Sequence, residues 1–150
     1  MQKFIYPSIG KDSIFLKKIN LKDFKLTFRS KYRAGVSSDN NKYNSQKEFY
    51  ENIRNNLYTF CLRGTGNFSV RFYETLAMGR IPILINTDCK LPLDHLIDWN
   101  KHSIITTEKK MINDIIRFHV SKSNEEIIAI QKNNRDLWLN FLTSENYFKQ

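Results

Sequence analysis

The sequence has little of what marks several large classes of protein. It contains only 2 cysteines, 3 prolines and 5 glycines in 150 residues. Cys61 and Cys89 have neither a CxxC spacing nor a histidine at metal-ligand spacing, so neither a zinc site nor a disulfide framework is expected. Proline and glycine at this level exclude collagen-like and low-complexity chains. We expect a globular α/β protein whose cysteines stay as free thiols, as in a reducing compartment.

Long apolar runs are also missing. No stretch approaches the ~20 apolar residues that a membrane-spanning helix requires. Residues 1–13 (MQKFIYPSIGKDS) lack the apolar segment of a secretory signal. The expectation is therefore a soluble, cytoplasmic protein without a membrane span, and a peripheral position at a membrane stays open.

Acidic residues are fewer than basic ones. Lys and Arg total 24 and Asp and Glu total 15, so the formal net charge is +9. Such an excess favours anionic partners: nucleic acid, an anionic membrane surface or a phosphorylated small molecule. A solvated surface rich in Lys and Asn explains many of these charges equally well. The basic residues are spread along the chain without a pattern of stacking aromatics, so nucleic acid is not the expected partner.

What the sequence does contain is an alternation of short apolar runs with helical segments. Residues 24–30 (FKLTFRS) alternate like a half-buried strand. The runs LYTFCL and SIITT have the length and composition of strands, and IPILIN has the continuous apolar character of a strand buried on both faces. Strands that alternate with helices predict a Rossmann-like, mainly parallel sheet with helices on both faces.

The helices are indicated by capping signals and by apolar residues at helical spacing. Ser45-x-x-Glu48 has the form of a capping box that opens a helix through about residue 55. A second helix over 69–78 is stopped by Gly79. Two more are predicted over 109–119 and, from a second capping box (Ser123-x-x-Glu126), over 123–142.

One loop has the features of an anion site, the segment RGTGNF from Arg63 to Phe68. It follows a predicted strand and precedes a predicted helix, whose first backbone N–H groups and partial positive charge favour an anion. Gly64 and Gly66 tolerate left-handed backbone and allow close approach of a ligand. Ser69 is placed to cap the helix, and its hydroxyl is also in position to bond a phosphate oxygen.

Charged residues around this loop fit a nucleoside diphosphate. Arg63 and Arg71 would offer fork-shaped donors to the two phosphates. Glu74, three residues after Arg71, lies on nearly the same helical face and would accept bonds from ribose hydroxyls. An Arg71–Glu74 pair along the helix is the simpler alternative, and the loop matches neither the P-loop nor the GxGxxG pattern. The residues alone therefore indicate an anion site and no more.

The segment CLRGTGNFSVRFYETLAMGRIPILI, followed by LPLDHLIDWNKHSII, resembles the exostosin-like glycosyltransferases. The shared pattern is C-x-R-G, a loop of small residues, S-x-R-x-Y-E, G-R-I-P, L-P and I-D-W. The stretches KYRAG (31–35) and EFYENI (48–53) also resemble bacterial members. The resemblance extends over most of the chain beyond the first twenty or so residues.

This resemblance implies a GT-B architecture, in which two Rossmann-like domains face each other and the C-terminal one holds the nucleotide sugar. Such enzymes are inverting transferases, usually metal-independent, that use nucleotide sugars such as UDP-sugars in polysaccharide biosynthesis. Carried over to this sequence, Arg63, Ser69 and Arg71 would neutralise the diphosphate and Glu74 would hold the ribose. Positive charge would take the place of a metal at the leaving group, so no cofactor is expected.

Other residues near the loop have weaker assignments. Arg33 would reach the pocket from the loop after the first predicted strand, although a solvated arginine is an equal alternative. Asp88 follows a predicted strand, where a role in a turn is favoured. Asp98 and Trp99 are expected to fix the packing of a loop. The three histidines have no partner spacing, so no catalytic base is assigned.

The length of the chain is that of one GT-B domain, since such enzymes contain two domains of ~150 residues each. We expect an atypical or truncated segment over residues 1–20 and a single nucleotide-sugar-binding domain over residues 21–150. The expected partners are a nucleotide sugar, a glycan acceptor and a missing N-terminal half or partner chain. Alone, the chain should bind donor and transfer nothing. The alternatives are an inactive remnant or interaction module with the same fold, or a basic nucleic-acid-binding domain.

Overall fold

The computed structural model describes residues 39–149, and the chain divides into two units between Thr59 and Phe60. The strand predicted over 24–30, the stretch KYRAG and Arg33 lie outside the described residues.

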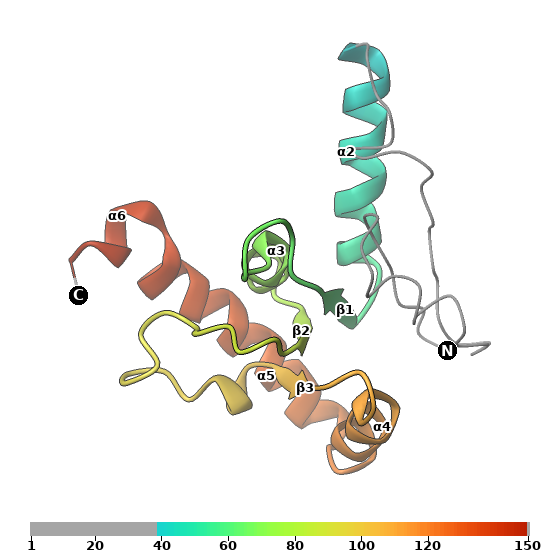
Figure 1. Ribbon diagram of the computed structural model, residues 1–150, viewed down its shortest axis with the longest axis vertical. Helices are drawn as coiled ribbons and strands as arrows, with labels where there is room; N and C mark the ends of the chain where they lie inside the picture. Colours follow the sequence, from blue (N-terminus) through green and yellow to red (C-terminus); the bar gives the residue numbers. More distant parts are fainter. Residues whose placement is uncertain (1–38, 150) are drawn as a thin grey trace. The chain divides into compact units, whose positions relative to one another are not determined.

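Helix α2, Asp39–Arg54, is the main described element of the first unit (Figure 1). The prediction that this helix starts at Ser45 was wrong, because α2 is already formed at Asp39. Asp and Asn are as favourable at a helix start as Ser, so the run DNN offers a start signal upstream of the capping-box pattern. Ile53 is buried and Phe49 is half-buried, in keeping with their spacing of four residues along one helical face.

A three-stranded sheet of order β1-β2-β3 carries the second unit. Strand β2 pairs in parallel with β3, with Ile83 opposite Ile104 and Ile85 opposite Thr106. Every residue of β2 is buried, as its continuous apolar sequence predicts. The strands are β1, Tyr58–Cys61, β2, Ile81–Ile85, and β3, Ile104–Thr106.

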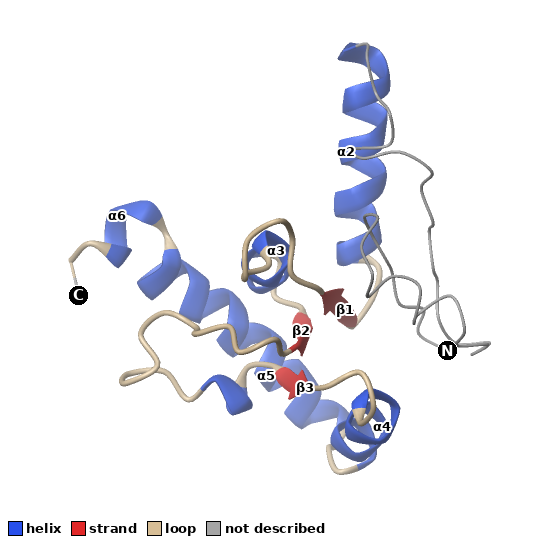
Figure 2. Ribbon diagram, in the orientation of Figure 1, coloured by secondary structure: helices blue, strands red, loops and turns tan. Residues whose placement is uncertain are grey.

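Helices follow the strands in the order that the sequence predicts (Figure 2). Helix α3, Val70–Ala77, connects β1 to β2 and packs on β2, and α4, Met111–Val120, packs on β3. Helix α5, Asn124–Leu137, packs on both α3 and β2. Strand, helix and parallel strand in succession confirm the predicted α/β, Rossmann-like class.

The ends of these helices are set by local chemistry. The predicted capping box at the start of α5 is formed: the Ser123 backbone N–H donates to Glu126 Oε2 at 2.7 Å, and the Glu126 N–H donates to Ser123 Oγ at 3.2 Å. After α3, Gly79 takes a φ of +60°, which an L side chain rarely adopts. A Cβ atom there would also lie 3.0 Å from the carbonyl oxygen of Gln131. Gly79 therefore both ends α3 and lets α5 approach.

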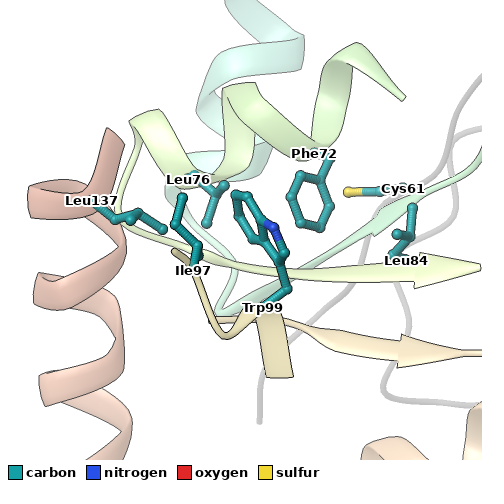
Figure 3. Packing of buried hydrophobic residues seen from close by; sticks show 7 residues of the cluster. All are labelled: Cys61, Phe72, Leu76, Leu84, Ile97, Trp99 and Leu137. Atoms are coloured by element: carbon teal, nitrogen blue, oxygen red, sulfur yellow. The ribbon is translucent and has the colours of Figure 1, made fainter. Parts of the chain in front are cut away.

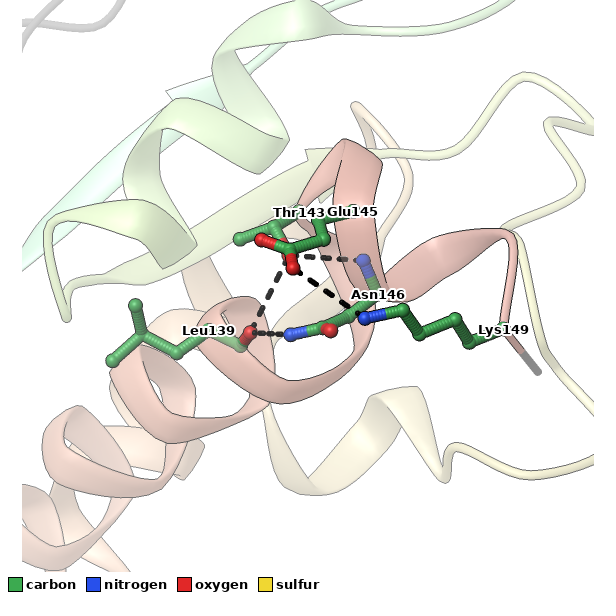
Figure 4. A network of polar contacts seen from close by, with 5 residues as sticks. All are labelled: Leu139, Thr143, Glu145, Asn146 and Lys149. Carbon is green, nitrogen blue, oxygen red and sulfur yellow. Dashed lines mark hydrogen bonds and ion pairs between the residues drawn. The ribbon is translucent and has the colours of Figure 1, made fainter.

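The C-terminal helix differs in detail from its prediction over 123–142. After Leu137 the chain continues as a π-helical turn, η3, Trp138–Leu142, and then as a short helix α6, Ser144–Tyr147. Figure 4 shows how the turn between them is closed. Asn146 donates from Nδ2 to the carbonyl oxygen of Leu139 at 2.9 Å, and Lys149 Nζ lies 3.4 Å from Glu145 Oε1.

Buried apolar side chains from β1, α3, β2, the segment after β2 and the end of α5 meet in one cluster (Figure 3). Phe72 of α3 packs edge-to-face on Trp99, with ring centroids 5.4 Å apart. The indole Nε1 of Trp99 donates to the carbonyl oxygen of Pro92 at 3.0 Å, which confirms its predicted packing role. The cluster comprises Cys61, Phe72, Leu76, Leu84, Ile97, Trp99 and Leu137.

One buried polar side chain ties α5 to the sheet. Asn134 is fully buried, and its Nδ2 donates to the carbonyl oxygens of Arg80 and His102, both at 2.9 Å. Its Oδ1 lies 2.8 Å from Nδ1 of His102. Each polar atom of the buried amide thus has a partner, as burial requires.

Candidate anion-binding site

The glycine loop leads from the end of β1 at Cys61 into α3 as predicted. The Gly64 N–H donates to the carbonyl oxygen of Phe68 at 3.0 Å, which closes the loop on itself. The Phe72 N–H donates to the carbonyl oxygen of Ser69 at 3.1 Å, which starts the first turn of the helix. The loop therefore lies at the carboxyl end of a strand, where ligands bind in open α/β sheets.

The two glycines of the loop do not use the left-handed backbone that they tolerate. Among the described glycines only Gly79 has a positive φ, so neither Gly64 nor Gly66 uses left-handed backbone. A Cβ atom on Gly66 would lie 2.7 Å from the exposed Phe68 ring, whereas one on Gly64 would meet nothing within 4 Å. Gly66 thus lets the loop fold over the Phe68 ring, and Gly64 borders open space that a ligand can enter.

Ser69 occupies the N-cap position of α3, as predicted, with φ −123° and ψ 111°. It is buried, and its hydroxyl makes no capping hydrogen bond to the helix. The serine therefore fixes the position of the helix start through its backbone. The expected contact between its hydroxyl and a phosphate stays a prediction.

Arg71 and Glu74 are brought together over the end of β1. Both are half-buried on α3. Burial raises the pKa of the Glu74 carboxyl, and the Arg71 guanidinium opposes that shift in pKa. Burial raises the pKa of the Cys61 thiol to about 12, while Arg71 lowers it and Glu74 raises it further. All three groups therefore act on one another electrostatically at this corner of the sheet.

Arg63 is positioned differently from Arg71. It lies two residues after the end of β1 and is exposed, and it forms no hydrogen bond or ion pair with another residue in the part of the chain that the structure describes. No contact in the described part of the chain therefore links Arg63 to Arg71. An exposed arginine side chain has many rotamers. The guanidinium of Arg63 would therefore take a fixed position only once an anion is bound.

A contact that the sequence did not reveal links the glycine loop to the segment after β2. The Thr87 hydroxyl donates to Asn67 Oδ1 at 2.6 Å, across twenty residues of sequence. Next to it, Asn86 Oδ1 accepts from the Cys89 N–H at 3.2 Å, and Asp88 takes a φ of 59°. This tight turn confirms the predicted role of Asp88. The one sign of a functional segment in the sequence here was that polar residues directly follow a buried strand.

Two cavities lie along the carboxyl ends of β2 and β3, and Asn86 and Ile105 line both. Neither is lined by the predicted donor-site residues. Cavity 1 has a volume of about 600 Å³ and is lined by Leu84, Asn86, Cys89, Lys90, Leu91, Asp94, His95, Leu96, Ile97, Asp98, Trp99, Asn100 and Ile105. Cavity 2 has about 450 Å³ and is lined by Asn86, Ile105, Thr106, Thr107, Lys110, Asn113, Asp114 and Arg117.

Other titratable residues have structural partners. The side chain of Asp98 accepts from the Asn100 N–H at 3.3 Å at the start of the short helix η2, Trp99–Lys101, which confirms its role in loop packing. His95 Nδ1 lies 3.9 Å from Asp94 on an exposed part of the loop. Within residues 39–149 no group of three His, Cys, Asp or Glu is arranged to hold a metal ion.

The fold and the loop together define an α/β protein of Rossmann-like class with a candidate anion site after its first described strand. The family model of the exostosin GT47 domain matches residues 22–120, and the chain therefore belongs to that family. The predicted resemblance to glycosyltransferases is confirmed. None of the helices in the described range is long and apolar enough to cross a membrane.

Three relatives illustrate the match. The chain is 35% identical over 114 residues to exostosin-1 of Drosophila melanogaster, covering 73% of this chain and 13% of the relative. It is 32% identical over 108 residues to an exostosin-1 homolog of Caenorhabditis elegans (71% and 27%). A probable glucuronosyltransferase of Oryza sativa subsp. japonica is 30% identical over 104 residues (66% and 23%). The chain thus spans about a quarter or less of the length of these relatives.

Proposed function

We propose that the chain is the donor-binding part of an inverting glycosyltransferase of GT-B architecture that acts in polysaccharide biosynthesis. Its donor would be a nucleotide sugar, with UDP as the nucleotide. The rice relative, named as a glucuronosyltransferase, makes UDP-glucuronic acid a reasonable donor to test. The chain would act with an acceptor-binding half that its described residues do not include.

The observation that carries this proposal is the joint placement of Arg71 and Glu74. Both lie on the first turns of α3, at the carboxyl end of β1 and within the region that the family model matches. The glycine loop before them is closed by its own backbone bond and borders open space at Gly64. A diphosphate at this corner would meet positive charge and a helix start, and a ribose would meet a carboxylate.

Each residue would have a distinct role during transfer. Negative charge develops on the diphosphate as its bond to the sugar breaks, and the guanidinium groups of Arg63 and Arg71 would stabilise that charge. Glu74 would accept bonds from the ribose hydroxyls and so orient the nucleotide. We assign no metal to this step; a chelator should leave UDP binding unchanged. The base that deprotonates the acceptor would come from the other half.

A thermal-shift titration of the purified chain with UDP tests the proposal. Ligand at about 100 times its Kd should stabilise the fold by about 2.7 kcal/mol. Arg71→Lys keeps the charge but loses the fork, and Glu74→Gln keeps the shape but loses the carboxylate, so both should reduce the shift measured from each variant's own melting temperature. Glu108→Gln is the matched control for Glu74→Gln, and Lys132→Met shows the effect of removing one positive charge at an exposed position outside the loop.

A chain that shows neither stabilisation nor binding heat with UDP, GDP or their sugars would contradict the proposal. It would favour the alternative of an inactive remnant that keeps the family fold to pair with another chain. Equal loss of the shift in the control variants would likewise contradict a specific site at α3.

A further inference from the structure

A single hydrogen bond from outside holds the glycine loop, residues 63–68. Among the described residues beyond the loop, only Thr87 bonds to one of its groups, and its Oγ1 donates to Asn67 Oδ1 at 2.6 Å. We propose that Thr87 is a positioning residue for the donor site, because it fixes the glycine loop through Asn67. This inference rests on the proposed function and adds to it a residue that would act without touching the donor.

The loop's own bond does not fix its position. The Gly64 N–H donates to the Phe68 carbonyl oxygen at 3.0 Å, which sets the shape of the loop but joins it to no other segment. Arg63 and Phe68 at its two ends are exposed, so little packing holds them. Without the bond from Thr87, the loop would be free to turn about its connections to β1 and α3. An anion would then have to order the loop as it binds, at a cost in affinity.

The Thr87 side chain belongs to a turn that is itself anchored. The Asn86 N–H donates to the carbonyl oxygen of Thr106 on β3 at 2.8 Å, and Asn86 Oδ1 accepts from the Cys89 N–H at 3.2 Å. Asp88 takes a φ of 59°, in the left-handed region that Asp visits more readily than most residues. The bond from Thr87 to Asn67 therefore completes a chain of contacts that runs from β3 to the glycine loop.

The direction of this bond separates positioning from direct binding. Asn67 Oδ1 can only accept a hydrogen bond, so the Thr87 hydroxyl gives its proton to it. A hydroxyl has one proton, and an anion needs a donor. While the bond is formed, Thr87 therefore has no donor left for a phosphate oxygen, and it acts on the site only through Asn67 and the loop.

Calorimetric titration of the purified chain and its variants with UDP tests the proposal. Thr87→Val keeps the branched shape but removes the hydroxyl, and it should weaken UDP binding by about fivefold, the loss expected for one neutral hydrogen bond. Thr87→Ser keeps the hydroxyl and should restore most of the affinity. The matched control is Thr107→Val, at an exposed position after β3 whose side chain makes no hydrogen bond with another described residue.

A double-mutant cycle separates action through Asn67 from an independent effect. Asn67→Ala removes the other half of the same bond, so Thr87→Val/Asn67→Ala should bind UDP no more weakly than the weaker of the two single variants. Losses that add would show that the two residues act independently and would overturn the positioning role. Failure of Thr87→Ser to restore the affinity, or an equal loss in Thr107→Val, would do the same.

Amide hydrogen exchange of the ligand-free chain, measured by NMR, tests the same bond without UDP. The Gly64 N–H should exchange faster in Thr87→Val than in the parent, because a loop without its outside bond opens more often. It should exchange at the parental rate in Thr87→Ser and Thr107→Val. Equal exchange in Thr87→Val and the parent would overturn the inference.

The two measurements together separate this inference from the proposed function. Faster exchange in Thr87→Val without UDP binding by the parent would leave Thr87 as the residue that fixes the loop and would remove the donor site. Equal UDP affinity in the parent and Thr87→Val would leave the donor site standing and overturn the role of Thr87.

Discussion

At the scale of single residues, the proposed site places Glu74 where its charge is unfavourable. Burial raises the pKa of this carboxyl, and Arg71 offsets only part of the rise. Between the ordinary pKa of a glutamate and this raised value, the folded chain holds a proton that the unfolded chain has released. The free energy of unfolding therefore falls as the pH rises through this window, and it stays lower at neutral pH.

Glu74→Gln should for this reason raise the melting temperature of the ligand-free chain at pH 7, and should flatten the fall in stability above the ordinary glutamate pKa. The same substitution should reduce stabilisation by UDP. Melting curves from pH 4 to pH 8 for the two proteins, with Glu108→Gln as control, measure both effects. A variant that melts lower than the parent at pH 7 would contradict an electrostatic cost at Glu74.

The two cysteines should differ sharply in reactivity. Cys61 is fully buried with its thiol pKa raised to about 12, and Cys89 is partly exposed with a pKa raised by burial. Since only the thiolate reacts, we expect one thiol per chain to be modified by a thiol reagent at pH 8, and the second only after denaturant is added. Cys89→Ser should remove the early step. Modification of Cys61 in the folded chain at a similar rate would contradict its burial.

Some residues of the candidate site could be predicted from the sequence and others could not. Arg71 and Glu74 were predictable because residues three apart on a helix share a face whatever the tertiary structure. Gly64 and Gly66 do not use the left-handed backbone that they tolerate, since the loop closes through a bond from Gly64 to Phe68 and needs no positive φ. The bond between Asn67 and Thr87 depends on which loops the sheet brings together, and no local pattern encodes it.

At the scale of elements, the Asn134 side chain joins α5 to the sheet through three polar contacts. Its Nδ2 donates to the carbonyl oxygens of Arg80 and His102, which precede β2 and β3, and its Oδ1 lies close to His102 Nδ1. Asn134→Ala would leave these partly buried groups without their partner, at a cost of about 3 kcal/mol in the free energy of unfolding. Urea denaturation measures the change, and Asn133→Ala, exposed on the same helix, should cost little. Equal costs at the two positions would contradict the network.

The end of α3 gives a second test. Gly79→Ala places a side chain at φ +60° and 3.0 Å from the Gln131 carbonyl oxygen, so it should destabilise the chain by about 1–2 kcal/mol. Gly64→Ala is its matched control, since a Cβ there meets nothing within 4 Å. Denaturation curves of the two variants should separate clearly, and similar midpoints would show that the close approach of α3 and α5 relaxes freely.

The elements themselves were largely predictable, but their limits were less so. Strands β1, β2 and β3 were indicated by apolar runs between polar loops, and the start of α5 by a capping box that the structure forms. The start of α2 was misplaced because a capping-box pattern also occurs inside helices. The π-turn after Leu137 was not predicted, since it depends on how Trp138 and its neighbours pack and not on helical spacing.

At the scale of the whole molecule, the chain belongs to the exostosin GT47 domain family but spans about a quarter or less of the length of the relatives described. We therefore expect the purified chain to bind UDP and to release none from UDP-glucuronic acid when oligosaccharide acceptors are added. A coupled assay for UDP release measures this. Turnover well above the rate without acceptor would show that the acceptor-activating base lies within these 150 residues. The domain limits of 1–20 and 21–150, the metal independence and the compartment stay predictions.

The π-turn η3 has a consequence for how this sequence can change over evolutionary time. An α-helix that gains one residue rotates everything beyond the insertion away from its former neighbours, unless a wider turn takes up the extra length. The apolar cluster that includes Leu137, the last residue of α5, is also contacted by three residues of the π-turn, Trp138, Phe141 and Leu142. The wider turn thus keeps these side chains on the core. Loss of a single residue from this turn would restore ordinary helical winding, so natural variants that differ by one residue in length are expected here first.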